Sequence, residues 1–113
     1  MPRRSHNYYI YIMASINKVI YVGVTNDLIR RGYQHIRGTY GGFTKKYKCH
    51  KLVYYEHFDF IQDAIKREKE LKGWKREKKI KLIENNNLEW SDLYPDLVEF
   101  SKTAGFRSFK RSW

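Results

Sequence analysis

Two short runs of strand-forming residues near the amino end constrain the fold most. Residues 8–13 are rich in Tyr and Ile, residues 19–25 are rich in Val, Ile and Tyr, and only residues 14–18 separate them. Such compositions favour β-strands, and a short connection favours a hairpin. A two-stranded hairpin is marginal by itself in water. A third run at residues 52–56 therefore predicts a three-stranded sheet.

Alternation along the two runs predicts which side chains share a face of this sheet. Successive residues of a strand point to opposite sides, so Tyr9, Tyr11, Tyr21 and Gly23 lie on one face. The other face carries Ile10, Ile12, Ile20, Val22 and Val24. The aliphatic face needs a cover of helices. The opposite face offers phenol groups beside Gly23, which lets another backbone or a phosphate approach closely.

Helical patterns follow at residues 27–37, 60–73 and 74–83, and the first begins at the capping residue Asp27. Residues 40–44 predict a flexible loop before a basic stretch, and residues 88–93 predict a turn anchored by Trp90. Pro95 then predicts a break. We expect an α/β (α+β) domain at residues 7–94: a small two-layer domain with a three-stranded, mainly antiparallel sheet flanked by three or more helices. A basic, aromatic tail at residues 95–113 would be either disordered or a nucleic-acid arm.

Charge points to a polyanionic partner. The 113 residues include 23 Lys+Arg and 12 Asp+Glu, a formal net charge of +11, which favours nucleic acid over a merely soluble surface. The single cysteine, Cys49, excludes an internal disulfide, and no apolar run approaches the ~18 residues of a membrane span. We expect a cytoplasmic protein with no membrane partner, and a monomer is favoured.

A glutamate on an apolar helix face is the most informative single residue. At about 100° per residue from Ile61, Glu68 lies on the same side as Ala64, Ile65 and Leu71, whereas Glu70 points away. A carboxylate facing a core is unfavourable by several kcal/mol unless it is paired or bound to a cation. Helix geometry leaves two interpretations open: a buried ion pair, for instance with Arg31, or a metal ligand.

Two tyrosine-containing motifs, an arginine and a histidine precede Glu68 in a specific order. Singly, a strand tyrosine is most often a packing residue and a helix histidine a surface residue. The ordered set is more specific: Tyr9-Ile10-Tyr11, Tyr21-Val22-Gly23, Arg31 eight residues later, His35 one helical turn on, and the downstream Glu68. Over residues 7–94 this order resembles the GIY-YIG nucleases, although Tyr9 stands where the family has a glycine.

The resemblance implies a divalent-metal-dependent DNA endonuclease that hydrolyses phosphodiester bonds with Mg²⁺, for which Mn²⁺ would substitute, and no small-molecule cofactor. Glu68 would be the metal ligand and Arg31 would hold the scissile phosphate. Tyr11 and Tyr21 would flank the attacking water, one as general base, with His35 as an alternative proton acceptor. Expected nucleic-acid contacts are Gly23, Lys45, Lys46, Lys48 and Asn87.

Two alternatives stay open. One is a catalytically silent nucleic-acid-binding module of the same fold, and the other is a small basic protein that binds RNA or another protein. The sequence does not choose between DNA repair and other DNA processing. It places branched, nicked and single-stranded substrates on equal terms with duplex.

Overall fold

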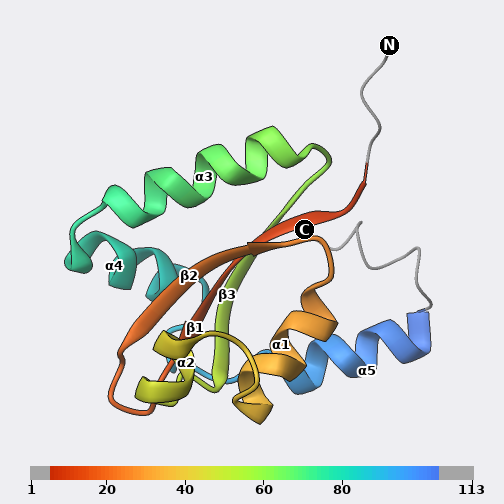
Figure 1. The fold of residues 1–113 in the computed structure, drawn as a ribbon, viewed down its shortest axis with the longest axis horizontal. Coiled ribbons are helices and arrows are strands. Elements are labelled where there is room, and N and C mark those ends of the chain that lie inside the picture. Colours follow the sequence, from red (N-terminus) through yellow and green to blue (C-terminus); the bar gives the residue numbers. More distant parts are fainter. Residues whose placement is uncertain (1–5, 105–113) are drawn as a thin grey trace.

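A computed structural model of the protein describes residues 6–104. Its sheet contains β1 (Tyr8–Ala14), β2 (Ile20–Thr25) and β3 (Lys51–Phe58) in the order β2-β1-β3, with both pairs antiparallel (Figure 1). The helices are α1 (Leu28–Arg37), α2 (Gly42–Tyr47), α3 (Ile61–Gly73), α4 (Arg76–Asn86) and α5 (Tyr94–Ala104). Within the described range, every helix is too short or too polar to cross a membrane.

The central strand β1 is buried on both faces. Ile10 and Ile12 pack in one cluster with apolar residues of α3 and α4, whereas Tyr11 packs in a second cluster with Leu28 of α1 and Leu97 of α5. Figure 1 shows these helix pairs on opposite sides of the sheet. The predicted α+β class with a three-stranded antiparallel sheet is confirmed. Helices cover the tyrosine face as well as the aliphatic face, which adds a layer to the two expected.

The short helix α2 spans residues 42–47 and so includes residues 42–44 of the flexible loop predicted at residues 40–44. Gly41 and Lys48 take left-handed backbone angles at its two ends, with φ of 64° and 56°. Thr44 is buried, and its hydroxyl donates to the carbonyl of Tyr40 at 2.7 Å. The loop prediction is wrong for these residues, because this buried threonine fixes a segment whose glycines suggested freedom.

Pro95 lies in the first turn of α5, where the sequence predicts a break. A proline is compatible with a first turn because those backbone N–H groups have no partner within the helix. Asp92 accepts a hydrogen bond from the backbone N–H of Tyr94 at 3.1 Å, and Leu97 is buried in the second cluster. The first part of the predicted tail is thus a packed helix, while most of the predicted basic arm lies outside the described residues.

Candidate active site

The hairpin brings Tyr11 onto Gly23, its partner across the two strands. A Cβ atom at position 23 would lie 2.5 Å from Cζ and Oη of the Tyr11 ring. Only glycine leaves room for the phenol at this point. The close approach expected at Gly23 is therefore made by the Tyr11 ring and not by a phosphate at that position.

Helix α1 carries Arg31 and His35 to the same side of the sheet. The helix begins at Asp27, whose Oδ1 accepts a hydrogen bond from the backbone N–H of Arg30 at 3.1 Å. His35 is fully buried, and its Nε2 lies 2.9 Å from the Tyr11 hydroxyl. The His35 ring is also 5.5 Å, centre to centre, from the ring of Tyr21. The structure thus brings together the tyrosines, the arginine and the histidine that the sequence selects.

Tyr40 joins this group, although sequence reasoning did not find it. Its ring meets His35 edge-on with centres 4.8 Å apart, and Cζ of Arg31 lies 4.1 Å from the centre of the same ring. Tyr40 follows a helix end and precedes two glycines, so no periodicity marks it. We refer to Tyr11, Tyr21, Arg31, His35 and Tyr40 as the tyrosine–histidine cluster.

Burial keeps Tyr11, Tyr21 and His35 neutral. It raises the pKa of Tyr11 far above the ordinary value, and Arg31 acts in the opposite sense. Burial and the neighbouring Tyr40 raise the pKa of Tyr21. Burial, together with the positive charge of Arg31, lowers the pKa of His35 to about 4. At neutral pH both phenols hold their protons and the imidazole is uncharged.

Solvent access separates the two phenols. Tyr11 and His35 are fully buried, and Nδ1 of His35 has no hydrogen-bond partner within the described range. Tyr21 is only partly buried. Water can therefore reach the ring of Tyr21, whereas Tyr11 and His35 lie beneath the surface and pack against the other rings of the cluster.

Glu68 reaches the cluster from α3, and its negative charge contributes to the raised pKa of Tyr21. Its carboxylate lies 3.2 Å from Nζ of Lys72, one turn further along the helix, and the side chain is 17 % exposed. Of the two interpretations left open, the structure shows an ion pair, but with Lys72 of the same helix and not with Arg31, because Glu68 lies at the rim of the helix interface. The neighbouring Ile65 is 37 % exposed at the same rim.

Comparison with known proteins agrees with this geometry. The sequence profile described as the GIY-YIG catalytic domain matches residues 7–81. The chain belongs to the GIY-YIG family. A UPF0213 protein of Staphylococcus saprophyticus is 40 % identical over 76 residues, which cover 67 % of this chain and 93 % of the relative. A UPF0213 protein of Haloquadratum walsbyi is 36 % identical over 77 residues, which cover 68 % and 86 %.

A solved structure shares this GIY-YIG fold. The solution NMR structure of a UPF0213 protein from Bacillus halodurans superimposes with a TM-score of 0.51 at 25 % identity, covering 88 % of this chain and 99 % of that one. The names of these relatives state no activity. The family supports a nuclease-type domain with DNA as the substrate class.

The GIY-YIG site fits a metal held by few protein ligands. Within residues 6–104 no group of three or more His, Cys, Asp or Glu side chains converges on one point. A cation at Glu68 would therefore take one carboxylate and complete its shell with water and substrate oxygens. Mg²⁺ commonly binds in this way. Lys72 would have to release the carboxylate, which an exposed lysine does readily.

The residues expected to contact nucleic acid differ in exposure: the lysines are exposed and Asn87 is buried. Lys45, Lys46 and Lys48 are exposed on and beside α2, next to the tyrosine–histidine cluster. Asn87 instead faces inward: its Nδ2 donates to the carbonyls of Val53 and Ser91 at 3.1 and 2.9 Å, and its Oδ1 accepts from the Ser91 N–H at 3.0 Å. Both N–H groups of its amide are used by β3 and by the turn after α4, so Asn87 supports the fold, and a nucleic-acid contact at Asn87 stays a prediction.

Proposed function

We propose that the protein is a divalent-metal-dependent DNA endonuclease acting in DNA repair or in structure-selective DNA processing. The observation that carries the proposal is the state of Arg31. It stacks on Tyr40 and donates from Nε to Gln34 Oε1 at 3.1 Å. In the described part of the chain no carboxylate forms an ion pair with it. A guanidinium held in place without an anionic partner is suited to bind a phosphate.

Each side chain then has a distinct role. Arg31 binds a non-bridging oxygen of the scissile phosphate and stabilises the charge that grows there as water attacks phosphorus and the bond to the leaving oxygen breaks. Tyr21, the accessible phenol, contacts the attacking water and takes its proton once its own has gone to solvent. Tyr11 and His35 are positioning residues, since their mutual hydrogen bond lies below the surface.

Glu68 would hold the cation at the rim beside Tyr21. When bound, the cation supplies positive charge that neutralises the phosphate and lowers the pKa of a nearby phenol. The raised pKa of Tyr21 in the protein alone is consistent with a site that needs this charge. Proton removal by Tyr21 would otherwise be rare at neutral pH.

The test is cleavage of end-labelled duplex, nicked, flapped and four-way DNA at low salt with Mg²⁺ or Mn²⁺. Wild type is compared with Glu68→Gln and with Glu70→Gln, a matched control on the same helix whose side chain is 52 % exposed. We expect wild type and Glu70→Gln to cut and Glu68→Gln to be inactive. All three should bind DNA equally in EDTA, measured by fluorescence anisotropy.

Other outcomes contradict the proposal in different ways. Binding without cleavage by any variant, in either metal, would favour a silent nucleic-acid-binding module. Equal cutting by wild type and Glu68→Gln would exclude Glu68 as the metal ligand.

A further inference from the structure

Helix α2 presents a row of aromatic rings that begins at the tyrosine–histidine cluster and ends in solvent. The ring centre of Phe43 lies 6.0 Å from that of Tyr21, and Tyr47 lies 4.8 Å further on from Phe43. Phe43 is 44 % exposed and Tyr47 is 42 % exposed. Large exposed aromatic side chains lose hydrophobic stabilisation, so adjacent exposed rings beside a candidate active site indicate a binding surface.

The backbone beneath these rings is well held. Thr44, between them in sequence, is buried and bonded to the carbonyl of Tyr40. The N–H of Cys49 donates to the carbonyl of Thr44 at 3.0 Å, and its thiol donates to the carbonyl of Val19 at 3.6 Å. The two rings therefore keep a defined place relative to the β1–β2 hairpin. A binding surface benefits from such preorganisation because less order is lost on binding.

The charge around the rings identifies the partner. Lys45, Lys46 and Lys48 are exposed, and Nζ of Lys46 lies 5.3 Å from the centre of the Tyr47 ring. Residues 38–55 contain no Asp or Glu. A surface that combines lysines with ring faces matches the pattern of proteins that bind single-stranded nucleic acid, in which bases stack on aromatic side chains and lysines contact the backbone. A partner protein surface of ordinary mixed charge would leave these lysines without anions.

We propose that Phe43 and Tyr47 form a stacking platform for unpaired bases next to the scissile phosphate. This proposal rests on the nuclease function and narrows its substrate class to DNA with single-stranded nucleotides at the cleavage point, such as flaps and overhangs. The bases of an intact duplex already stack on one another and offer the platform no free face. The protein should prefer single-stranded over duplex DNA, because an unpaired base that stacks on a protein ring adds binding free energy and a base paired in a duplex does not.

The first experiment measures binding in EDTA, so that it does not depend on cleavage. Fluorescence anisotropy compares a labelled single strand with the duplex of the same sequence, for wild type and for Phe43→Ala/Tyr47→Ala. We expect single-strand affinity to fall about tenfold or more in the double variant, with duplex affinity nearly unchanged. Tyr33→Ala is the matched control, because Tyr33 is 53 % exposed on α1 outside the platform, and it should bind both DNAs as wild type does.

Two further variants separate stacking from simple hydrophobic contact and from misfolding. Phe43→Tyr/Tyr47→Phe keeps both rings and should retain single-strand affinity, whereas Phe43→Leu/Tyr47→Leu keeps apolar surface without rings and should lose it. Tyr47→Ala alone leaves the Phe43–Tyr21 contact intact and should give a partial loss. A single strand carrying 2-aminopurine should lose fluorescence on binding to wild type and not on binding to the Leu variant.

The outcomes are distinguishable from failure of the nuclease function. Selective loss of single-strand binding in protein that never cleaves would retain the platform and reject the enzyme. Cleavage by wild type, with the Ala and Leu variants binding and cutting flapped DNA as wild type does, would retain the enzyme and reject the platform. Equal losses on single strand and duplex, or the same loss in Tyr33→Ala, would also overturn the platform, because it would show a general electrostatic effect. Variants that change binding to neither DNA would assign the surface to a protein partner instead.

Discussion

Two polar clusters lie on opposite faces of the sheet and differ in how completely their groups are paired. The first is the tyrosine–histidine cluster, where Arg31 has no carboxylate partner and Nδ1 of His35 has no hydrogen bond within residues 6–104. The second, the Arg67 network, consists of Tyr54, Glu56, Arg67 and Glu70. Both contain an arginine and tyrosines, so residue type alone does not distinguish them.

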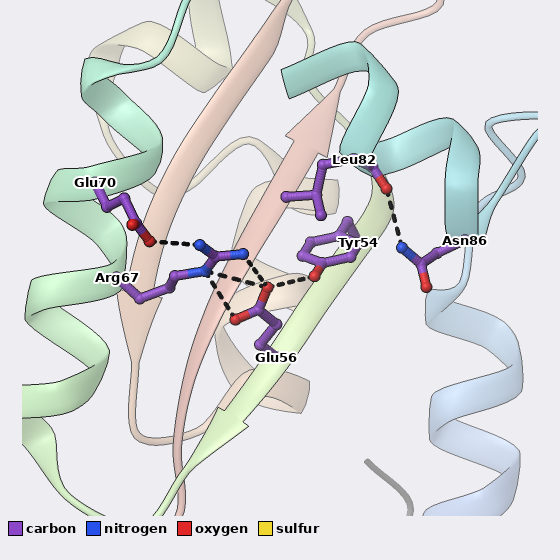
Figure 2. Close-up of polar contacts among 6 residues, drawn as sticks. All are labelled: Tyr54, Glu56, Arg67, Glu70, Leu82 and Asn86. Carbon is purple, nitrogen blue, oxygen red and sulfur yellow. Dashed lines mark hydrogen bonds and ion pairs between the residues drawn. The ribbon is translucent and has the colours of Figure 1, made fainter. Parts of the chain in front are cut away.

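The Arg67 network satisfies nearly all of its groups internally (Figure 2). Arg67 donates from Nε to Oε1 and from Nη2 to Oε2 of Glu56, each at 3.0 Å, and also pairs with Glu70. The Tyr54 hydroxyl donates to Glu56, and hydrogen bonding to Glu56 raises the pKa of Arg67 further. These bonds fix α3 against β3 and pair the positive charge of Arg67 with two carboxylates.

In this protein the rigidly held groups without a partner lie on the candidate functional face. A buried polar group without a partner destabilises the fold, so a cluster that keeps such groups is explained better by a ligand than by stability. The Arg67 network has the opposite character, since its pairs stabilise the helix that carries Glu68. Changes in the first cluster should therefore affect activity, and changes in the second should affect stability.

The largest expected effect is on the cleavage rate, and it distinguishes Tyr21 from Tyr54. Tyr21→Phe removes the proposed proton acceptor and should lower the cleavage rate by about 10²–10⁴-fold, the usual range for general base catalysis. Tyr54→Phe in the Arg67 network should leave the rate unchanged. The measurement is the rate constant against pH: it should rise with pH in wild type, because the Tyr21 phenol must lose its proton, and be flat in Tyr21→Phe. An unchanged slope would exclude Tyr21 as the base.

Two arginines give the second contrast. Arg31→Ala should lower cleavage by about 10²–10³-fold, since it removes a donor aimed at the transition state. Its melting temperature should change little, because no ion pair is lost among the described residues. Single-turnover cleavage and differential scanning fluorimetry measure the two quantities. A large fall in melting temperature with retained cleavage would reverse the assignment of roles.

Arg67→Met should lower stability and leave the cleavage rate nearly unchanged, in contrast to Arg31→Ala. It leaves the partly buried Glu56 without its cation and should reduce the free energy of unfolding by about 1–3 kcal/mol. The melting temperature should fall by several degrees in a domain of this size. Urea denaturation checks the loss. Glu56→Gln/Arg67→Met should recover part of it, because no unpaired charge remains, and a double variant no better than Arg67→Met would contradict this explanation.

Gly23→Ala tests the close packing of Tyr11. The added Cβ would meet the Tyr11 ring at 2.5 Å, and this overpacking should lower stability by about 1–2 kcal/mol. The displaced phenol would break its bond to His35, so cleavage should fall too. Gly73→Ala is the control, because nothing lies within 4 Å of a Cβ there. Equal stability of the two variants in urea would show that the Tyr11 ring moves freely.

The last prediction concerns the dependence of stability on pH, which is small at each pH step. The folded pKa of His35, about 4, lies below its ordinary value of 6.5, so the unfolded chain binds this proton first as pH falls. Stability should therefore decrease as pH is lowered from 6.5 towards 4, with a slope of at most about 1.4 kcal/mol per pH unit. Urea denaturation of His35→Gln should show a flatter pH dependence than wild type. His6→Gln, which changes an exposed histidine, should keep the wild-type slope.

The sequence predictions that are correct concern side chains placed by neighbours within one strand or one helix. The hairpin, the shared face of Tyr11 and Tyr21 and the shared face of Arg31 and His35 are correct because each depends on local periodicity. The helix with an apolar face that includes Glu68 is also correct. The loop predicted at residues 40–44 and the break predicted at Pro95 are wrong in part, because residues 42–47 form α2 and Pro95 lies in the first turn of α5. Glycine and proline suit a helix start as well as a loop, so composition did not separate the two. The inward position of Asn87 depends on Val53, which is distant in the sequence.

Local periodicity was enough to predict the hairpin of the α+β core, the face that Tyr11 shares with Tyr21 and the face that Arg31 shares with His35, because strand and helix periods place side chains without reference to the rest of the chain. The roles assigned to these residues came from the resemblance to the GIY-YIG family. Tertiary contacts bring Tyr40 into the site and Arg67 to Glu56. These contacts depend on how helices and loops dock on the sheet. Docking is set by packing of both faces together, which no single segment of sequence encodes.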